Sequence, residues 1–272
     1  MSKLPDEKPP FIVELAGGVL TLSFNRPEHR NAMPSHAVPQ LERLFRETAT
    51  DPDVRVLLIR AEGPNFGGGG DVQGMQLSLA KSSEGRREEY QARLERGRSM
   101  VRAFCELEIP VVVACRGSVA GLAMLYPLGA DVVLADESAF FLCAHQQVGL
   151  TPDGGISYLL PRVVGVKKAL DLILTARRVG ADEALAIGLL SRLVPAPDLE
   201  SEALKQAQRL AQAPQRVLRA AKAMVKQSLD TDLDSQLCKE RDLVVQCVTE
   251  PDFDEGVNAF LEKRRPRFPS AS

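Results

Sequence analysis

The fold can be worked out from one segment, Pro110-Val-Val-Val-Ala-Cys115-Arg-Gly117-Ser-Val-Ala-Gly-Leu122. Its first half is an uncharged run rich in β-branched residues that predicts a buried strand, and Gly117-Ser118 then turns the chain into an apolar helix. The first amides of a helix have no acceptor inside the helix and lie at the positive end of its dipole. This turn could therefore bind an oxyanion, although an ordinary strand-to-helix turn explains the same residues.

A second glycine-marked turn comes earlier, at Phe66-Gly-Gly-Gly-Gly70-Asp71, after a buried strand predicted at residues 54–59. Four successive glycines let the backbone approach a ligand closely, and their amides can point into one concavity. A flexible surface loop is equally compatible with this composition. The spacing fits neither G-x-G-x-x-G nor a Walker A sequence, which argues against a nucleotide-phosphate loop of those types.

Strands alternate with helices along most of the chain, and only helices follow. The patterns predict strands at residues 11–15, 19–24, 54–59, 110–115, 131–135 and 139–142, and a helix at 39–50. Residues 72–81 are predicted to form a loop. The charged residues 82–98 are predicted to form a mobile segment that leads into a solvated helix. Amphipathic helices are expected at 199–212, 214–228, 233–248 and 252–264. We therefore expect an α/β core over residues 1–198 and a helical oligomerisation region over 199–272.

The bulk composition excludes several classes of partner. The 272 residues carry a formal net charge of −2 with a pI near 6.0, so no overall positive field would attract nucleic acid or an anionic membrane. The longest apolar run, residues 119–130, is too short to cross a bilayer and contains Pro127. No signal peptide is visible, and we expect a cytoplasmic protein.

The five cysteines and three histidines form no metal-binding pattern. The cysteines are odd in number and none stand at C-x-x-C spacing, so reduced thiols are expected. The histidines form neither H-E-x-x-H nor a Cys/His cluster, so no metal is expected.

Several segments, in this order and spacing, resemble signatures of the enoyl-CoA hydratase/isomerase (crotonase) family. Residues 25–32 resemble N-R-P-x-x-R-N-A, 66–71 resemble F-x-x-G-x-D, 110–121 resemble P-V-I-A-x-x-x-G-x-x-x-G, 149–155 with 160–165 resemble the segment after the family's base position, and 255–264 resemble E-G-x-x-A-F-L-E-K-R. The resemblance implies an α/β spiral of ββα units with a C-terminal helical trimerisation region. It also implies a homotrimer or homohexamer and an acyl-CoA thioester substrate, with no cofactor beyond the coenzyme A of that substrate.

The same resemblance suggests roles for individual residues. Gly70 and Leu122 stand where backbone amides form an oxyanion hole, although Leu122 replaces a usual glycine. A thioester carbonyl gains enolate charge when an α-proton leaves, and one fixed donor to such an oxyanion is typically worth about 2.7–4 kcal/mol. Contacts to the substrate or its CoA are expected from Arg30, Gly68, Gly69, Asp71, Gly121 and Lys263. Without the resemblance, Arg30 is a solvated loop residue, and Asp71 braces its loop as a turn or cap.

The chain departs from the hydratases of this family at both glutamates that hold and activate water. The corresponding positions are Leu125 and His145. Ordinary two-glutamate hydration is therefore not expected, and double-bond isomerisation or a related proton transfer is favoured.

Asp153 and His145 are the candidate proton carriers. Asp153 matches the carboxylate of family isomerases, and histidine is the residue type that most often transfers protons near neutral pH. Alternatively, Asp153 caps a helix predicted to start at Gly154, and His145 is a structural hydrogen-bonder. Crotonase-like β-diketone hydrolases place a histidine and an aspartate in this region, so C–C hydrolysis by this pair stays open, as does a non-catalytic acyl-CoA-binding protein.

Overall fold

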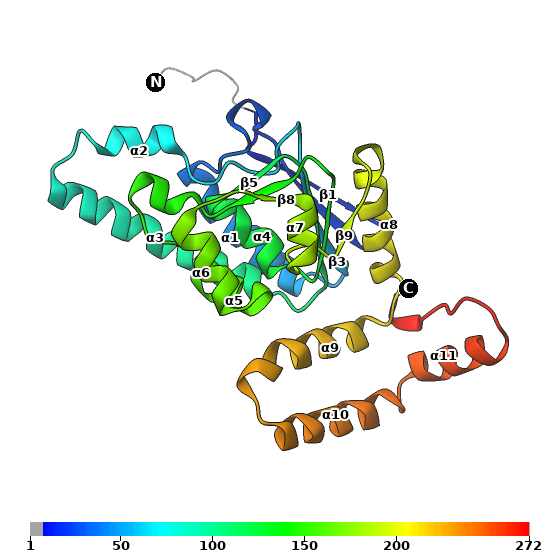
Figure 1. The fold of residues 1–272 in the computed structure, drawn as a ribbon. Helices are drawn as coiled ribbons and strands as arrows, with labels where there is room; N and C mark the ends of the chain where they lie inside the picture. The colour runs from blue at the N-terminus through cyan, green and yellow to red at the C-terminus, as the bar shows by residue number, and fades with distance from the viewer. Residues whose placement is uncertain (1–7, 272) are drawn as a thin grey trace.

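A six-stranded sheet forms the centre of the computed structural model, which describes residues 8–271 apart from the side chains of residues 72 and 73 (Figure 1). Its strand order is β1-β2-β3-β4-β6-β9, in which β1 and β2 are antiparallel and all other neighbours are parallel. The strands are β1 (Phe11–Ala16), β2 (Val19–Phe24), β3 (Val56–Ala61), β4 (Val111–Cys115), β6 (Val132–Ala135) and β9 (Arg192–Leu193). The strands predicted for this sheet are confirmed, and the two-residue β9 is an addition.

A second sheet begins at the glycine turn after β4. Its strand order is β5-β7-β8, with β5 (Ser118–Ala120), β7 (Phe140–Leu142) and β8 (Val179–Gly180). The sequence predicts a helix directly after Gly117, but residues 118–120 pair in parallel with β7 instead. Gly117 takes φ 53, and its carbonyl accepts a hydrogen bond from the Phe140 amide at 2.8 Å, which aligns the chain with β7. A 3-10 helix (Gly121–Met124) then leads into α4 (Leu125–Gly129).

Helices cover both faces of the six-stranded sheet. The helices of this part of the molecule are α1 (Val38–Thr50), α2 (Val72–Ser78), α3 (Ser83–Cys105), α4, α5 (Ile156–Val164), α6 (Val166–Thr175), α7 (Ala181–Ala186) and α8 (Leu199–Ala211). On one face, Leu57 and Ile59 of β3 belong to a core shared with α1 and α3. On the other face, Val56 and Leu58 pack against α8. The alternation follows from the two-residue period of a strand and explains why residues 56–59 of β3 are all apolar.

The region between residues 72 and 98 differs from the sequence prediction. Where the sequence predicts a loop, α2 follows Asp71, whose carboxylate accepts a hydrogen bond from the Gly74 amide at 3.1 Å. Where it predicts a mobile segment, α3 follows Ser82, whose hydroxyl accepts from the Gly85 amide at 3.1 Å. Both are N-caps, which supply an acceptor to an otherwise orphaned helix amide. The predicted bracing role of Asp71 is confirmed as a cap.

The last three helices project away from the two sheets (Figure 1). They are α9 (Gln215–Gln227), α10 (Leu233–Cys247) and α11 (Pro251–Leu261), close to their predicted ranges. The predicted division at residues 198/199 falls before α8, but α8 buries Leu199 and three alanines against the large sheet. Judged by packing, the boundary between the α/β core and the helical region lies between α8 and α9. Among the described residues, no helix has the length and apolarity needed to cross a bilayer.

Candidate active site

Two backbone turns, residues 67–70 and 117–122, lie side by side near the carboxyl ends of β3 and β4. The Gly67 amide donates to the Ser118 carbonyl at 2.8 Å, and the Ala120 amide donates back to the Gly67 carbonyl at 2.9 Å. The contact requires glycine at Gly69, which takes φ +89 and where a Cβ would lie 2.7 Å from the Ala120 carbonyl oxygen. An L side chain there would be both strained and in collision.

This contact brings together two backbone amides, those of Gly70 and Leu122, that have no acceptor among the described residues. The Gly70 amide donates no hydrogen bond within the described residues. Leu122 is the second residue of its 3-10 helix, so its amide precedes the first hydrogen bond of that helix. A Cβ built on Gly121 would lie 4.0 Å from the Gly70 nitrogen, which shows how closely the two turns approach. Paired donors of this kind can polarise a carbonyl oxygen.

Buried polar side chains hold the two turns in place. The Asn65 side-chain oxygen accepts from the Ser118 amide at 3.1 Å. Asn31, only 5% exposed and at φ 54, donates to the carbonyls of Asn65 at 2.7 Å and Glu62 at 2.9 Å. Asn31, the second asparagine of the N-R-P-x-x-R-N-A segment, is therefore structural in this protein, and it anchors the segment that carries Arg30. Its role could not be inferred from the pattern alone.

His145 and Asp153 meet beside the turns. The His145 Nε2 atom lies 3.1 Å from Asp153 Oδ1, and the His145 Nδ1 atom is buried without a partner in the described residues. The side chain of His145 is 9% exposed and that of Asp153 is 42% exposed. The alternative that Asp153 caps a helix is wrong, because α5 begins at Ile156 and has no side-chain cap. The carboxylate reaches the imidazole instead.

These groups line one cavity of about 550 Å³. Of the residues predicted from the sequence, the cavity is lined by Gly68, Gly70, Gly121, Leu122, His145 and Asp153. Four predicted residues lie outside its lining: Gly69 packs on the second turn, Asp71 caps α2, Arg30 is exposed next to Gly68, and Lys263 follows α11. Leu125, at the position of the first missing glutamate, is fully buried in the core.

The side chain of Leu122 packs over Gly154. Gly154 takes φ +62, and a Cβ there would lie 2.4 Å from Leu122 Cδ1. The leucine that replaces a usual glycine is thus accommodated by the absence of a side chain next to Asp153. It adds an apolar surface to the cavity beside the carboxylate.

Sequence reasoning missed the contribution of α2 and α3 to the cavity. Met75 and Arg93 both lie near Gly70, since a Cβ on Gly70 would be 3.0 Å from Met75 Cε and 3.7 Å from Arg93 Nη2. The charged composition of residues 82–98 indicated solvation and gave no sign that Arg93 and Arg98 line the cavity. Within the described residues, no group of three or more His, Cys, Asp or Glu side chains could hold a metal ion.

Comparison with known proteins identifies the family. The model of the enoyl-CoA hydratase/isomerase family matches residues 14–271. The chain is 33% identical over 260 residues to a probable enoyl-CoA hydratase of Rhodobacter capsulatus, covering 94% of this chain and 96% of that protein. It is 33% identical over 252 residues to 1,2-epoxyphenylacetyl-CoA isomerase of Escherichia coli, covering 92% and 95%.

A solved structure shares the whole fold. The crystal structure of enoyl-CoA hydratase from Bacillus anthracis matches with a TM-score of 0.87 at 26% identity, covering 96% of this chain and 100% of that chain. The predicted crotonase-like α/β fold with a helical C-terminal region is therefore confirmed. The chain belongs to the enoyl-CoA hydratase/isomerase (crotonase) family.

Proposed function

We propose that this protein moves a proton on the acyl chain of an acyl-CoA thioester, with double-bond isomerisation as the net reaction. One observation carries the proposal: two acceptor-free amides and a hydrogen-bonded His145–Asp153 pair line the same cavity. The amides of Gly70 and Leu122 would bind the thioester oxygen as it becomes an enolate, and the pair would handle the proton. The E. coli relative is named 1,2-epoxyphenylacetyl-CoA isomerase, which supports an isomerisation on a CoA thioester here.

Asp153 is the better candidate for the base. Its carboxylate is the more exposed partner in the cavity, whereas His145 is almost enclosed. In this arrangement the His145 N–H donates to one carboxylate oxygen and orients it, as the middle hydrogen bond of a triad orients an imidazole. The other oxygen of Asp153 takes the proton from one carbon, the C–H electrons pass into the dienolate, and the same proton returns to another carbon as the double bond shifts.

Hydration is disfavoured because Leu125 and His145 stand where the hydratases of the family carry two water-holding glutamates. Leu125 is packed in the core and offers no hydrogen bond. Asp153 is then the only carboxylate among the described residues that line the cavity, and its Oδ1 is occupied by His145. A positioned water needs two such partners, so addition of water to crotonyl-CoA should be weak.

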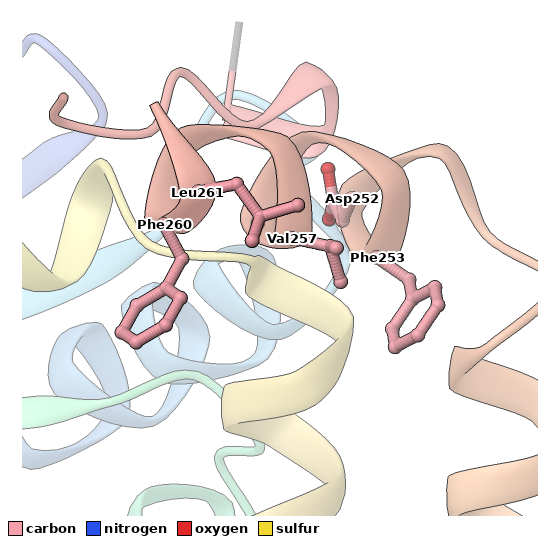
Figure 2. Close-up of a pocket in the computed structure, with 6 residues that line it drawn as sticks. Asp252, Phe253, Val257, Phe260 and Leu261 are labelled. Atoms are coloured by element: carbon pink, nitrogen blue, oxygen red, sulfur yellow. The ribbon is translucent and has the colours of Figure 1, made fainter. Parts of the chain in front are cut away.

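We further propose that the enzyme is a cytoplasmic trimer or pair of trimers, with Arg30 and Lys263 as contacts for CoA. The apolar surface of the projecting helices supports assembly: Phe253, Val257 and Phe260 project from one side of α11 beside a hollow of about 370 Å³ (Figure 2). Phe260 is 83% exposed, more than a side chain of its size should be on a lone chain. The five cysteines are unpaired, which suits a reducing compartment.

The test compares two variants on 3-hexenoyl-CoA, with product analysis by mass spectrometry and proton exchange in D₂O. Asp153→Asn removes the base and should lower turnover about 10²-fold or more. His145→Gln keeps an N–H donor and should lose less. Asp182→Asn, an exposed aspartate outside the cavity, is the matched control.

The outcomes separate the candidate functions. Full activity of Asp153→Asn with loss in His145→Gln would make the histidine the base. Rapid hydration of crotonyl-CoA, on the order of 10 s⁻¹, would contradict the isomerase proposal. Cleavage of a free β-diketone without any binding of acetoacetyl-CoA would favour the C–C hydrolase, and thioester binding without turnover would indicate a non-catalytic binder.

A further inference from the structure

Arg93 on α3 is a cation in the active-site cavity that pairs with no carboxylate among the described residues. It lines the cavity together with Arg98 and Arg102 of the same helix. Those two are engaged, Arg98 with Glu95 at 3.1 Å and Arg102 with Glu106 at 2.8 Å. Arg93 forms no ion pair in the part of the chain that the structure describes, and its guanidinium lies 5.6 Å from the centre of the Tyr90 ring.

The nearest acidic candidate on α3 is already occupied. Glu89 stands one turn before Arg93, and its carboxylate pairs with Lys81 at 3.3 Å. The pKa of Glu89 is lowered, first by a hydrogen bond from Ser78, with Lys81 and the charge of Arg93 contributing less. Asp153, the one carboxylate among the described lining residues, is held by His145. Within the described residues, Arg93 therefore has no carboxylate at ion-pair distance, and the nearby charge of Glu89 is shared with Lys81.

The position of Arg93 identifies the part of the ligand that it would meet. Its Nη2 atom lies 3.7 Å from the Cβ position of Gly70. Adding two bonds of about 1.5 Å places it no more than about 7 Å from the Gly70 amide that would hold the thioester oxygen. The long pantetheine arm separates the phosphates of CoA from the thioester, so a guanidinium this close faces the acyl half. Arg30 is exposed beside Gly68 and does not line the cavity.

The surroundings of Arg93 make an unpaired charge costly. The same wall of the cavity is lined by Met75, Leu94 and Val101, and the arginine itself is half-buried. A partly desolvated guanidinium without an ion-pair partner loses hydration that a distant ring and a shared charge replace only in part, and a bidentate carboxylate would restore it. We propose that Arg93 binds a carboxylate carried by the acyl group, so that the substrates are CoA thioesters of short dicarboxylic acids. This rests on the proposed function, since it presumes a thioester at the Gly70 amide.

Matched ligands isolate the contribution of the carboxylate. Adipyl-CoA and hexanoyl-CoA have acyl chains of the same length and differ by the terminal carboxylate, as do glutaryl-CoA and pentanoyl-CoA. By calorimetry, the wild-type protein should bind the better-fitting dicarboxylyl thioester at least about ten-fold more tightly than its neutral match, the range of a charge-assisted hydrogen bond. Arg93→Met should abolish this preference, and Arg93→Lys should keep part of it because the charge remains without the bidentate fork.

Arg96→Met is the control, because Arg96 is an exposed arginine of the same helix that does not line the cavity. It should leave the preference unchanged. Equal binding of the matched ligands by the wild type would overturn the proposal, and so would an equal loss for adipyl-CoA, hexanoyl-CoA and free CoA in Arg93→Met, which would assign Arg93 to CoA. If acetoacetyl-CoA and every other thioester fail to bind at millimolar concentration, the proposed function itself falls, and the inference falls with it.

Discussion

Gly67→Ala is the substitution that tests most directly whether the two turns must touch. Gly67 has no positive φ, so an alanine there adds a methyl group without backbone strain. That methyl carbon would lie 2.5 Å from the Cβ of Ala123, on the 3-10 helix that carries Leu122. Ala123 is 7% exposed and has no flexible side chain that could rotate away. The two backbones would have to separate.

The size of the effect follows from the overlap. Carbon atoms rest at about 3.5–4.0 Å, so the turns must part by about 1 Å. Overpacking of this kind costs about 1–3 kcal/mol of unfolding free energy. A shift of about 1 Å in a catalytic group can lower turnover about 10²-fold, so activity should fall clearly even under conditions in which the variant stays folded. Urea unfolding gives the first quantity. Affinity for acetoacetyl-CoA relative to free CoA reports the amides of Gly70 and Leu122.

The compensating change is Ala123→Gly, which removes the atom that the new methyl meets. Alone it should cost about 0.5–1 kcal/mol, the usual penalty for glycine in a helix. Combined with Gly67→Ala, it should restore most of the lost stability and of the preference for acetoacetyl-CoA. The double variant would then be more stable than the sum of the single effects by about 1–3 kcal/mol. Strict additivity, or a Gly67→Ala protein with undiminished thioester affinity, would refute the claim that this contact sets the position of the amides.

Two further predictions concern the helices beyond the sheets. Lys222→Met should lower the unfolding free energy by about 1–3 kcal/mol, because the Lys222 ammonium donates to Asp131 and the Ile109 carbonyl at 2.7 Å each; exposed Lys205→Met is the control. Burial lowers the pKa of Lys222 despite Asp131, so the unfolded chain holds this proton to higher pH. In denaturation curves, the unfolding free energy of the wild type should therefore rise relative to that of Lys222→Met as pH rises toward 10.5, the ordinary lysine pKa. Light scattering at micromolar concentration should give a trimer or hexamer for the wild type and a smaller mass for Phe260→Asp, and a monomeric wild type would contradict the assembly proposal.

The sequence predicts the parts of the fold in which a single pattern dominates. β3 and β4 are apolar on both faces, because Val56 and Leu58 meet one helix layer while Leu57 and Ile59 meet the other. Such runs can hardly be anything but buried strands. The glycines after them predict the positions of the two turns but not their form: the sequence leaves residues 66–71 open as a flexible loop, and residues 118–120 form a strand where a helix is expected.

The parts that the sequence could not predict depend on long-range contacts. A charged segment such as residues 82–98 has no apolar period to reveal that α3 is one continuous helix, and its caps are single residues. The 3.1 Å contact between His145 and Asp153 joins residues that the sequence leaves open as partners or as separate cap and hydrogen-bonder. The space for Leu122 over Gly154 depends on a backbone conformation at φ +62 that no local pattern specifies.

The contact between Leu122 and Gly154 also bears on the choice between isomerisation and hydration. Both reactions pass through negative charge on the thioester oxygen, so both use the paired amides. They differ in what stands beside the acyl chain: hydration needs a water held by two acceptors, and isomerisation needs one base that can reach two carbons. Here the leucine places an apolar side chain next to Asp153, and Leu125 packs in the core where a second acceptor would be required. We therefore propose that a site which keeps the amides and one carboxylate, with leucine at positions 122 and 125, favours returning the proton that it removes over adding water.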